Sequence, residues 1–249
     1  MISITIITKN EERNIDRCLS SLSWVNEIVI VDSGSTDNTL EICKKYKCKI
    51  IESPWMGFGK TKQLAVENAT HDWILSIDAD EEVSSQLALY IQDTIHSNSA
   101  QGYRIKRNSF YLNKEIKFSG WQKDYPLRLF NKNFGKFNDL AVHESVVMNE
   151  TSLVVRKIKF PIYHYPYPDL KTHIRKINDY TSIAAEEMFE MGKNTNFIRP
   201  FLSGLIKFIK IYLIKFGFLD GRHGLILSII SSFYVFLKYA KLWSLKRKQ

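Results

Sequence analysis

The sequence predicts an α/β protein built on a mostly parallel sheet. In the N-terminal part, short apolar runs rich in Ile and Val alternate with stretches of helical period. Several of these runs end in acidic or hydroxyl residues, as strands do at the edge of an open sheet where ligands bind. Alternating strands and helices indicate right-handed βαβ units, which form a parallel sheet with helices on both faces.

The elements follow from hydrophobic period and turn residues. We expect strands at residues 2–8, 27–31, 49–52 and 73–77, each a short β-rich run. We expect helices from a cap at Asn10 through residue 22, at 38–46, at 61–69, and after a cap at Ser84 or Ser85. Residues 102–155 hold short strand-like pieces with aromatic and charged residues, and a helical period returns from Leu170.

The basic charge lies at the C-terminal end of the chain. The protein has 249 residues and a formal net charge of +9, and residues 197–249 hold ten Lys or Arg against one acid, Asp220. These basic residues are interleaved with aliphatic ones, which argues against nucleic acid and favours an anionic membrane surface. The uncharged run at 224–237 is shorter than the roughly 20 residues of a membrane span, so interfacial amphipathic helices are expected. Helices that pack on the domain or on a partner subunit are the alternative.

Two further features bear on the compartment. The three cysteines have no metal-ligand spacing, which is typical of free thiols in a reducing compartment. The chain opens directly on an apolar strand without a basic leader, so no secretory signal is expected. Both features predict a cytoplasmic protein.

The strand at 73–77 ends in a run of carboxylates. Asp78 and Asp80 are two residues apart on extended backbone and point to the same side. Paired carboxylates are suited to a Mg²⁺ or Mn²⁺ ion that holds phosphates. A polar turn that caps the next helix is the alternative.

Residues 52–61 imitate a phosphate-binding P-loop. They follow a strand, precede a helix and end in Gly59, Lys60 and Thr61. The first glycine of that motif is Pro54 here, and proline has no N–H to donate to a phosphate. The sequence therefore argues against an ATPase.

The motifs at residues 8–11, 31–37 and 78–81 together resemble the family 2 inverting glycosyltransferases of GT-A fold. The resemblance continues through residues 120–121, Asp124, 128–130, 142–144 and 217–221, so it covers essentially the whole chain. In detail the chain looks most like bacterial lipopolysaccharide core enzymes that add a hexose to inner-core heptose. The resemblance implies a GT-A catalytic domain at 1–168, in which 1–100 bind the nucleotide sugar and 101–168 the acceptor. Residues 169–249 would be a helical region with a membrane-associating tail.

The resemblance also implies a donor site for a UDP-sugar and a divalent cation, Mg²⁺ or Mn²⁺. Asp80 would be the principal metal ligand and Asp78 would lie near the ribose and the metal. Lys62 would contact the diphosphate, with a surface lysine as the alternative. The remaining residues expected at the nucleotide are Thr8, Asn10, Glu11 and Asp32. Asp32 resembles the acid that accepts the uracil N–H, or alternatively caps the next helix.

Inversion needs one base opposite the leaving group. The resemblance favours Glu144, with Asp124 as the alternative and His143 orienting Glu144 or approaching the metal. The Glu-Asp pair common in the family is His-Glu here, so the base stays open between the two carboxylates. Trp121 and Arg128 are expected to shape the acceptor site, with a place in the core as the alternative for Trp121.

The expected function is a metal-dependent inverting hexosyltransferase on the inner face of a bacterial inner membrane. It would move glucose from UDP-glucose, as a β-1,4-glucosyltransferase, onto a lipid-linked inner-core heptose of lipopolysaccharide. A polyprenyl-phosphate sugar synthase of the same fold and a non-catalytic membrane-peripheral binding protein are the alternatives. The hexose, the linkage, the metal and the oligomeric state stay open.

Overall fold

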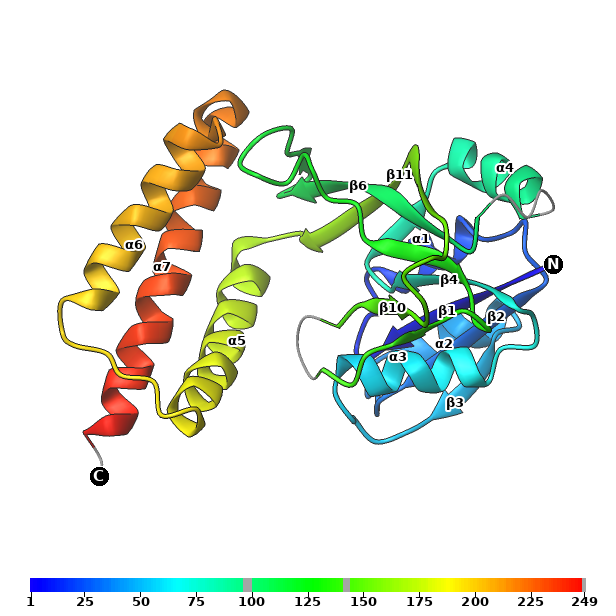
Figure 1. Ribbon diagram of the computed structural model, residues 1–249, viewed down its shortest axis with the longest axis horizontal. Helices are drawn as coiled ribbons and strands as arrows, with labels where there is room; N and C mark the ends of the chain where they lie inside the picture. The colour runs from blue at the N-terminus through cyan, green and yellow to red at the C-terminus, as the bar shows by residue number, and fades with distance from the viewer. Residues whose placement is uncertain (96–99, 141–143, 248–249) are drawn as a thin grey trace. The chain divides into compact units, whose positions relative to one another are not determined.

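The structure is a computed structural model that describes residues 1–95, 100–140 and 144–247 (Figure 1). It divides into two compact units, each treated by itself. The first unit consists of Met1–Arg107 and Asp124–His164, and the second of Asn108–Lys123 and Tyr165–Gln249. Residues 108–123, expected in the acceptor half, therefore group with the C-terminal helices. The predicted division into 1–100, 101–168 and 169–249 stays a prediction.

The parallel part of the sheet forms as predicted. It consists of β1 (Ile2–Thr8), β2 (Glu27–Asp32), β3 (Lys49–Glu52) and β4 (Trp73–Asp78), in the order β3-β2-β1-β4. The pairs β1–β2, β1–β4 and β2–β3 are all parallel. The connecting helices are α1 (Ile15–Ser20), α2 (Thr39–Lys45) and α3 (Phe58–Glu67). The carboxyl ends of β1, β2 and β4 thus share one edge of the sheet.

Beyond β4 the sheet continues through β8, β6, β11 and β5, and its described pairs there are antiparallel. These strands are β5 (Glu81–Val83), β6 (Gly102–Tyr111), β8 (Leu127–Asn131) and β11 (Val155–Tyr167), with β7 (Lys114–Glu115) paired to β6. A separate ribbon joins β9 (Gly135–Phe137) to β10 (Val146–Met148). The strict alternation of strand and helix therefore ends where the acidic run begins.

Two expected helix starts are corrected. Asn10 does not cap α1, because it adopts a left-handed φ of 57° and its Oδ1 accepts a hydrogen bond from the Thr36 N–H. The helix α3 begins at Phe58, earlier than expected, after Gly57 with a φ of 91°. At α4 (Ser85–Thr94) the expected cap is confirmed, since Ser84 Oγ accepts from the Leu87 N–H.

The sheet is covered on both faces, which explains its continuous apolar strands. Along β4, Leu75 and Ile77 enter the core cluster that contains residues of α1 and α4. Ile74 points to the opposite face and packs in the cluster that contains Ala65 and Val66 of α3. The strands are therefore buried from both sides, and their carboxyl ends are held rigidly.

The second unit is built on long helices. They are α5 (Leu170–Glu190), α6 (Arg199–Ile209) and α7 (Gly221–Lys246), with a π turn at Lys210–Ile214 and a 3₁₀ turn, η2, at Gly217–Asp220. The helices α6 and α7 lie side by side (Figure 1), and Ser232 Oγ of α7 donates to the Gly204 carbonyl of α6 at 2.7 Å. On the other side of α7, Lys241 Nζ donates to the Asn178 carbonyl of α5 at 2.7 Å.

The apolar helix of this unit is longer than the uncharged run at 224–237. Gly217–Lys246 forms 30 helical residues with mean hydropathy 1.5 in its most apolar window, of which 17% is buried. By length and composition it is the one helix in the described ranges able to cross a bilayer. Core helices of other proteins pass the same test.

Gly224 permits the contact between α7 and the turn that precedes it. A Cβ at Gly224 would lie 1.9 Å from the Gly217 carbonyl oxygen. Both glycines lie in the second unit, and Gly217 is itself buried. Alanine here would force the turn and the helix apart.

We therefore expect Gly224→Ala to destabilise the protein by about 2 kcal/mol, as overpacking does. An unhindered helical Gly→Ala change would instead stabilise by about 1 kcal/mol. Ser231→Ala, a half-buried site in the same helix, is the control and should be near neutral. Urea unfolding followed by circular dichroism measures both, and a Gly224→Ala protein as stable as the control would contradict the close contact.

Candidate functional site

The ends of β1 and β2 carry two buried hydroxyl groups. Thr8 pairs in register with Asp32, and the Ser33 N–H donates to the Thr8 carbonyl at 3.0 Å. The side-chain oxygens of Thr8 and Ser33 have no hydrogen-bond partner among the described residues, although these residues are only 5% and 6% exposed. Buried polar groups are nearly always satisfied, so this edge of the sheet is suited to a polar ligand.

Asp32 organises its own loop. Its Oδ2 accepts hydrogen bonds from the N–H groups of Gly34 at 2.9 Å and Ser35 at 2.8 Å, and its Oδ1 accepts from Ser35 Oγ. Gly34 has a φ of 84°, a conformation that favours glycine. The side chain thus holds the turn after β2 and does not cap the next helix, because α2 begins at Thr39 with Asn38 at its N-cap.

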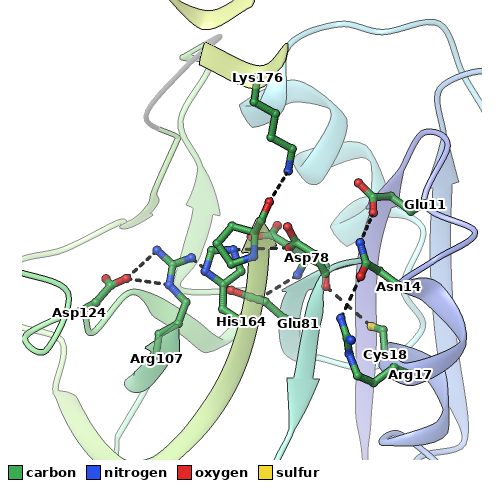
Figure 2. Close-up of polar contacts among 12 residues, drawn as sticks. Glu11, Asn14, Arg17, Cys18, Asp78, Glu81, Arg107, Asp124, His164 and Lys176 are labelled. Atoms are coloured by element: carbon green, nitrogen blue, oxygen red, sulfur yellow. Dashed lines mark hydrogen bonds and ion pairs between the residues drawn. The ribbon is translucent and has the colours of Figure 1, made fainter. Parts of the chain in front are cut away.

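Asn10 and Glu11 tie the first two loops together. Asn10 donates its N–H to Ser35 Oγ at 2.9 Å, and Glu11 donates its N–H to Thr39 Oγ1 at 2.9 Å. The Glu11 carboxylate accepts from Asn14 Nδ2 at 2.8 Å (Figure 2). The two backbone N–H contacts join the β1–α1 loop to the β2–α2 loop and the start of α2. Asn10 and Glu11 therefore position these loops through their own backbone N–H groups.

At the end of β4, Asp78 lies between two cations. Its Oδ1 is 2.7 Å from Lys62 Nζ and its Oδ2 is 2.5 Å from Arg128 Nη2. Burial raises the pKa of Asp78, but Arg128 and Lys62 outweigh burial and hold that pKa well below its usual value. Asp78 is therefore ionised, and both of its oxygens already have partners.

Glu81 is the hub of this network. It is fully buried, and its carboxylate accepts from the Asp78 N–H at 2.9 Å, Arg128 Nη2 at 3.1 Å and Arg107 Nη1 at 3.2 Å. Burial raises the pKa of Glu81, as does Asp78, yet the two arginines leave it lowered. A buried carboxylate is stable only with such partners.

Arg107 extends the network to Asp124. Its Nε and Nη2 lie 2.7 Å and 2.6 Å from Asp124 Oδ2 (Figure 2). Asp124, one of the two candidate bases, is thus tied through Arg107 to Glu81. Arg128, expected at an acceptor phosphate, is instead buried with its Nη2 against Asp78 and Glu81.

Glu144 reaches the same network through Lys62. Lys62 Nζ lies 2.6 Å from Glu144 Oε1, and Lys62 is only 2% exposed, which excludes a surface lysine. Gly59 allows this approach, because a Cβ there would lie 2.0 Å from the Asn138 carbonyl of the segment that leads toward Glu144. The glycine of the P-loop-like motif is therefore explained by close packing. His143 lies outside the described residues.

Asp80, the expected principal metal ligand, lies next to His164 of β11. Its Oδ1 is 3.6 Å from His164 Nε2, where β11 pairs with β5. The described ranges contain no group of three or more His, Cys, Asp or Glu side chains arranged to hold a metal. A single carboxylate such as Asp80 can serve a cation that takes most of its ligands from phosphates and water, as Mg²⁺ does.

Trp121 belongs to the second unit. Its ring meets Tyr111 edge-on at a centroid distance of 6.3 Å, beside the small core cluster of Tyr111, Ile116 and Leu227. It is half-buried. Packing against the core therefore explains the position of one side of the Trp121 ring.

Sequence reasoning missed four residues of this site. They are Ser33, Glu81, Arg107 and His164. Ser33 lies in a stretch of common turn residues and Glu81 is one of several acids in a run, so neither has a distinct local signal. Arg107 and His164 carried no local signal, because strands distant along the chain bring them to the site.

Comparison with known proteins identifies the family. Residues 3–151 match the family described as Glycosyl transferase family 2. An uncharacterized glycosyltransferase of Rickettsia typhi is 34% identical over 99% of this chain and 88% of its own length. The lipopolysaccharide core biosynthesis glycosyltransferase LpsC of Rhizobium meliloti is 29% identical over 97% of this chain and 92% of its own.

Solved structures agree on the fold. The mannosyltransferase PcManGT of Pyrobaculum calidifontis, in complex with GDP-Man and Mn²⁺, has a TM-score of 0.55 at 12% identity, covering 97% of this chain and 86% of its own. TarS 1–349 of S. aureus, in complex with UDP, has a TM-score of 0.52 at 17% identity, covering 100% of this chain and 92% of its own. With the family match over residues 3–151 and a relative similar along most of its length, this fold shows that the chain is a GT-A glycosyltransferase belonging to glycosyl transferase family 2.

Proposed function

We propose that this glycosyltransferase moves a hexose, glucose from UDP-glucose in the first instance, onto a lipid-linked inner-core heptose of lipopolysaccharide. The reaction would be a single inverting displacement assisted by a divalent cation. The observation that carries the proposal is the buried Lys62 ammonium, shared between Asp78 and Glu144 at the ligand edge of the sheet. The similarity to LpsC of Rhizobium meliloti supports the choice of acceptor.

The donor half of the proposal rests on buried polar groups. The Thr8 and Ser33 hydroxyls would hydrogen-bond the nucleotide, on loops that Asp32, Asn10 and Glu11 hold in place. Lys62 would turn its ammonium to the diphosphate. Asp80 would hold the divalent cation, which neutralises the charge on the departing diphosphate. Arg128 is assigned a new role, as the fixed counter-ion that keeps Asp78 and Glu81 ionised.

Glu144 is the proposed base. Its partner Lys62 is the same group that would meet the diphosphate, so Glu144 is linked to the donor through one side chain. Asp124 is held by Arg107 through two contacts. A base must be near the reacting centre before its proton affinity matters, and this favours Glu144 over Asp124. Trp121 stays the proposed contact with an acceptor sugar.

A lipid acceptor is consistent with the C-terminal charge. The ten basic residues of 197–249 would hold the enzyme at the inner leaflet, where a cytoplasmic enzyme meets a lipid-linked acceptor. The polyprenyl-phosphate acceptor is a second candidate, favoured by one observation. Both candidate bases are ion-paired, and a phosphate acceptor needs no strong base.

The donor and metal assignments predict a specific turnover pattern. We expect UDP-glucose to be consumed with Mg²⁺ or Mn²⁺ and not with EDTA, using heptose-bearing lipid A as acceptor. Asp80→Ala should lower turnover by roughly 10²-fold, because the cation loses its protein ligand. Asp93→Ala, on the exposed side of α4, is the control and should retain activity. Equal turnover by Asp80→Ala and Asp93→Ala would remove Asp80 from the metal site.

The two candidate bases differ in their expected kinetics. Glu144→Gln should lower kcat by roughly 10²-fold or more, because the variant cannot accept the acceptor proton. Asp124→Asn is isosteric and should have the smaller effect. The opposite ranking would make Asp124 the base. An unimpaired Glu144→Gln enzyme would support the phosphate acceptor.

Asp78 is also expected to stabilise the fold in a pH-dependent way. Its folded pKa lies below the unfolded value of about 3.9, so its charge stabilises the protein above that pH and loses this effect as pH falls through the folded pKa. Asp78→Asn should therefore be less stable than wild type at pH 7, and the difference should shrink in acid. Denaturant unfolding across pH measures this, with Asp93→Asn as the control. A constant difference would show that the ionised form is not what stabilises.

A further inference from the structure

The helical hairpin of the second unit exposes apolar side chains where a globular protein normally buries them. On α6 and the π turn these side chains follow a helical spacing along one side. The exposed members between residues 201 and 219, which we call the apolar face, are Phe201, Leu202, Leu205, Ile206, Ile209, Leu213, Ile214, Phe216, Phe218 and Leu219. Many exposed apolar side chains on one segment mark a surface that contacts another apolar phase.

The hairpin consists of α6, the π turn, η2 and α7, and η2 is its tip. The tip has one buried side and one exposed side. In η2, Gly217 and Asp220 are buried, whereas Phe218 and Leu219 are exposed. Phe216 precedes this turn with a left-handed φ of 55° and an exposed ring. A bulky residue rarely adopts this conformation, and here it presents an aromatic ring outward.

The buried side of the tip holds the loop that leads to Trp121. The Asp220 carboxylate, on a residue 3% exposed, accepts from the N–H groups of Lys117 at 3.0 Å and Phe118 at 3.1 Å, and from Ser119 Oγ at 2.8 Å. The Ser119 N–H donates to the Lys215 carbonyl at 3.0 Å. We call this set of bonds the Asp220 clamp.

Gly120 completes the contact. It has a φ of 91°, and a Cβ there would lie 2.5 Å from Lys215 Nζ. The backbone beside Trp121 therefore lies directly against the lysine that precedes the tip. The loop and the tip are one rigid piece of the second unit.

The charges around the apolar face indicate an anionic partner. Lysines 207, 210 and 215 are interleaved with its aliphatic residues. Burial lowers the pKa of Lys207, and the neighbouring ammonium groups of Lys215, Lys210 and Lys238 lower it further. Cations that repel one another are stabilised by an anion, and a lipid headgroup supplies one next to a hydrocarbon phase.

We propose that the apolar face inserts into the interfacial layer of an anionic lipid membrane and that the Asp220 clamp holds the Gly120–Trp121 loop against the same surface. The acceptor class that fits is a lipid whose sugar lies close to the headgroup layer. This deepens the proposed function and rests on its lipid acceptor. Vesicle binding can be measured without donor turnover, so the membrane proposal and the proposed function can fail separately.

A membrane span by α7 is the rival. The helices α6 and α7 lie side by side (Figure 1), so a spanning α7 would take Lys207 and Lys210 into hydrocarbon with it. Charged side chains in a bilayer core are strongly disfavoured. Interfacial insertion leaves these lysines at the headgroups.

The first test is sedimentation with phosphatidylcholine vesicles, with and without phosphatidylglycerol. Wild type should bind only the anionic vesicles, and Leu205→Glu/Ile209→Glu should lose about tenfold or more of that binding, because carboxylates then face lipid. Leu89→Glu, at an exposed leucine on α4 of the first unit, is the control and should bind as wild type. Three results would each overturn the proposal. They are a wild-type protein that does not bind the vesicles, binding that does not depend on phosphatidylglycerol, and an equal loss of binding in both variants.

The second test distinguishes insertion from spanning. Protein bound to anionic vesicles should be released by alkaline carbonate if it lies at the interface. Retention after carbonate would show a spanning α7 and overturn the interfacial arrangement.

The third test addresses the clamp. An environment-sensitive dye on Lys117→Cys, in a Cys48→Ser background because the other two cysteines are buried, should shift its emission to the blue on anionic vesicles. The same dye on Leu89→Cys should not shift. Asp220→Asn or Ser119→Ala should bind vesicles as before but reduce the shift. A Lys117→Cys dye that stays unchanged while vesicles bind would overturn the placement of the loop.

Discussion

The site depends on the compensation of buried carboxylates at the end of β4. Asp78 and Glu81 are ionised inside a well-packed unit, and they remain so because Lys62, Arg128 and Arg107 surround them. Removing any one of these cations would leave at least one of the two carboxylates with a single cationic partner, which would destabilise its ionised form. The four strands that contribute to the network are therefore tied to one another by charge as well as by the sheet. The rigidity that a transferase needs at its donor site follows from this requirement.

The same network links groups with different proposed tasks. Lys62 is bonded to both Asp78 and Glu144, so a ligand that draws the ammonium away changes the surroundings of both carboxylates. Arg107 joins Glu81 to Asp124 in the same way. Because these contacts are short and partly buried, they are screened much less than surface pairs. A substitution at one member should therefore affect the others, and double-mutant comparisons are needed to separate their contributions.

Glycine has a defined structural task at two positions that local motifs would explain differently. Gly59 belongs to a stretch that imitates a P-loop, yet its role is to let the Asn138 carbonyl approach α3. Gly120 combines a positive φ with the close approach of Lys215. In both cases the missing side chain makes room for a segment distant in the sequence. The residues next to each glycine in the sequence do not indicate the contact that the glycine makes possible.

Local pattern was sufficient for the parallel part of the sheet. The short apolar runs predict β1 to β4 with almost correct ends, and the acidic run after β4 marks the expected ligand edge. The roles of individual side chains are harder to predict from local pattern. Asn10 was expected to cap a helix, but its amide bonds to the next loop. Arg128 was expected at an acceptor, but buried carboxylates take its guanidinium.

The sequence by itself determined the fold class, the edge of the sheet where ligands bind and the basic character of the C-terminal part. These follow from hydrophobic period and charge, which are local properties of the chain. Only the tertiary structure decided which carboxylate meets which cation, since Arg107 and His164 come from strands far along the chain. Only the tertiary structure showed that Asp220 holds the loop at Gly120. The hydrogen bond from Ser119 to Asp220 joins residues far apart in the sequence, and no periodic pattern in the sequence indicates it.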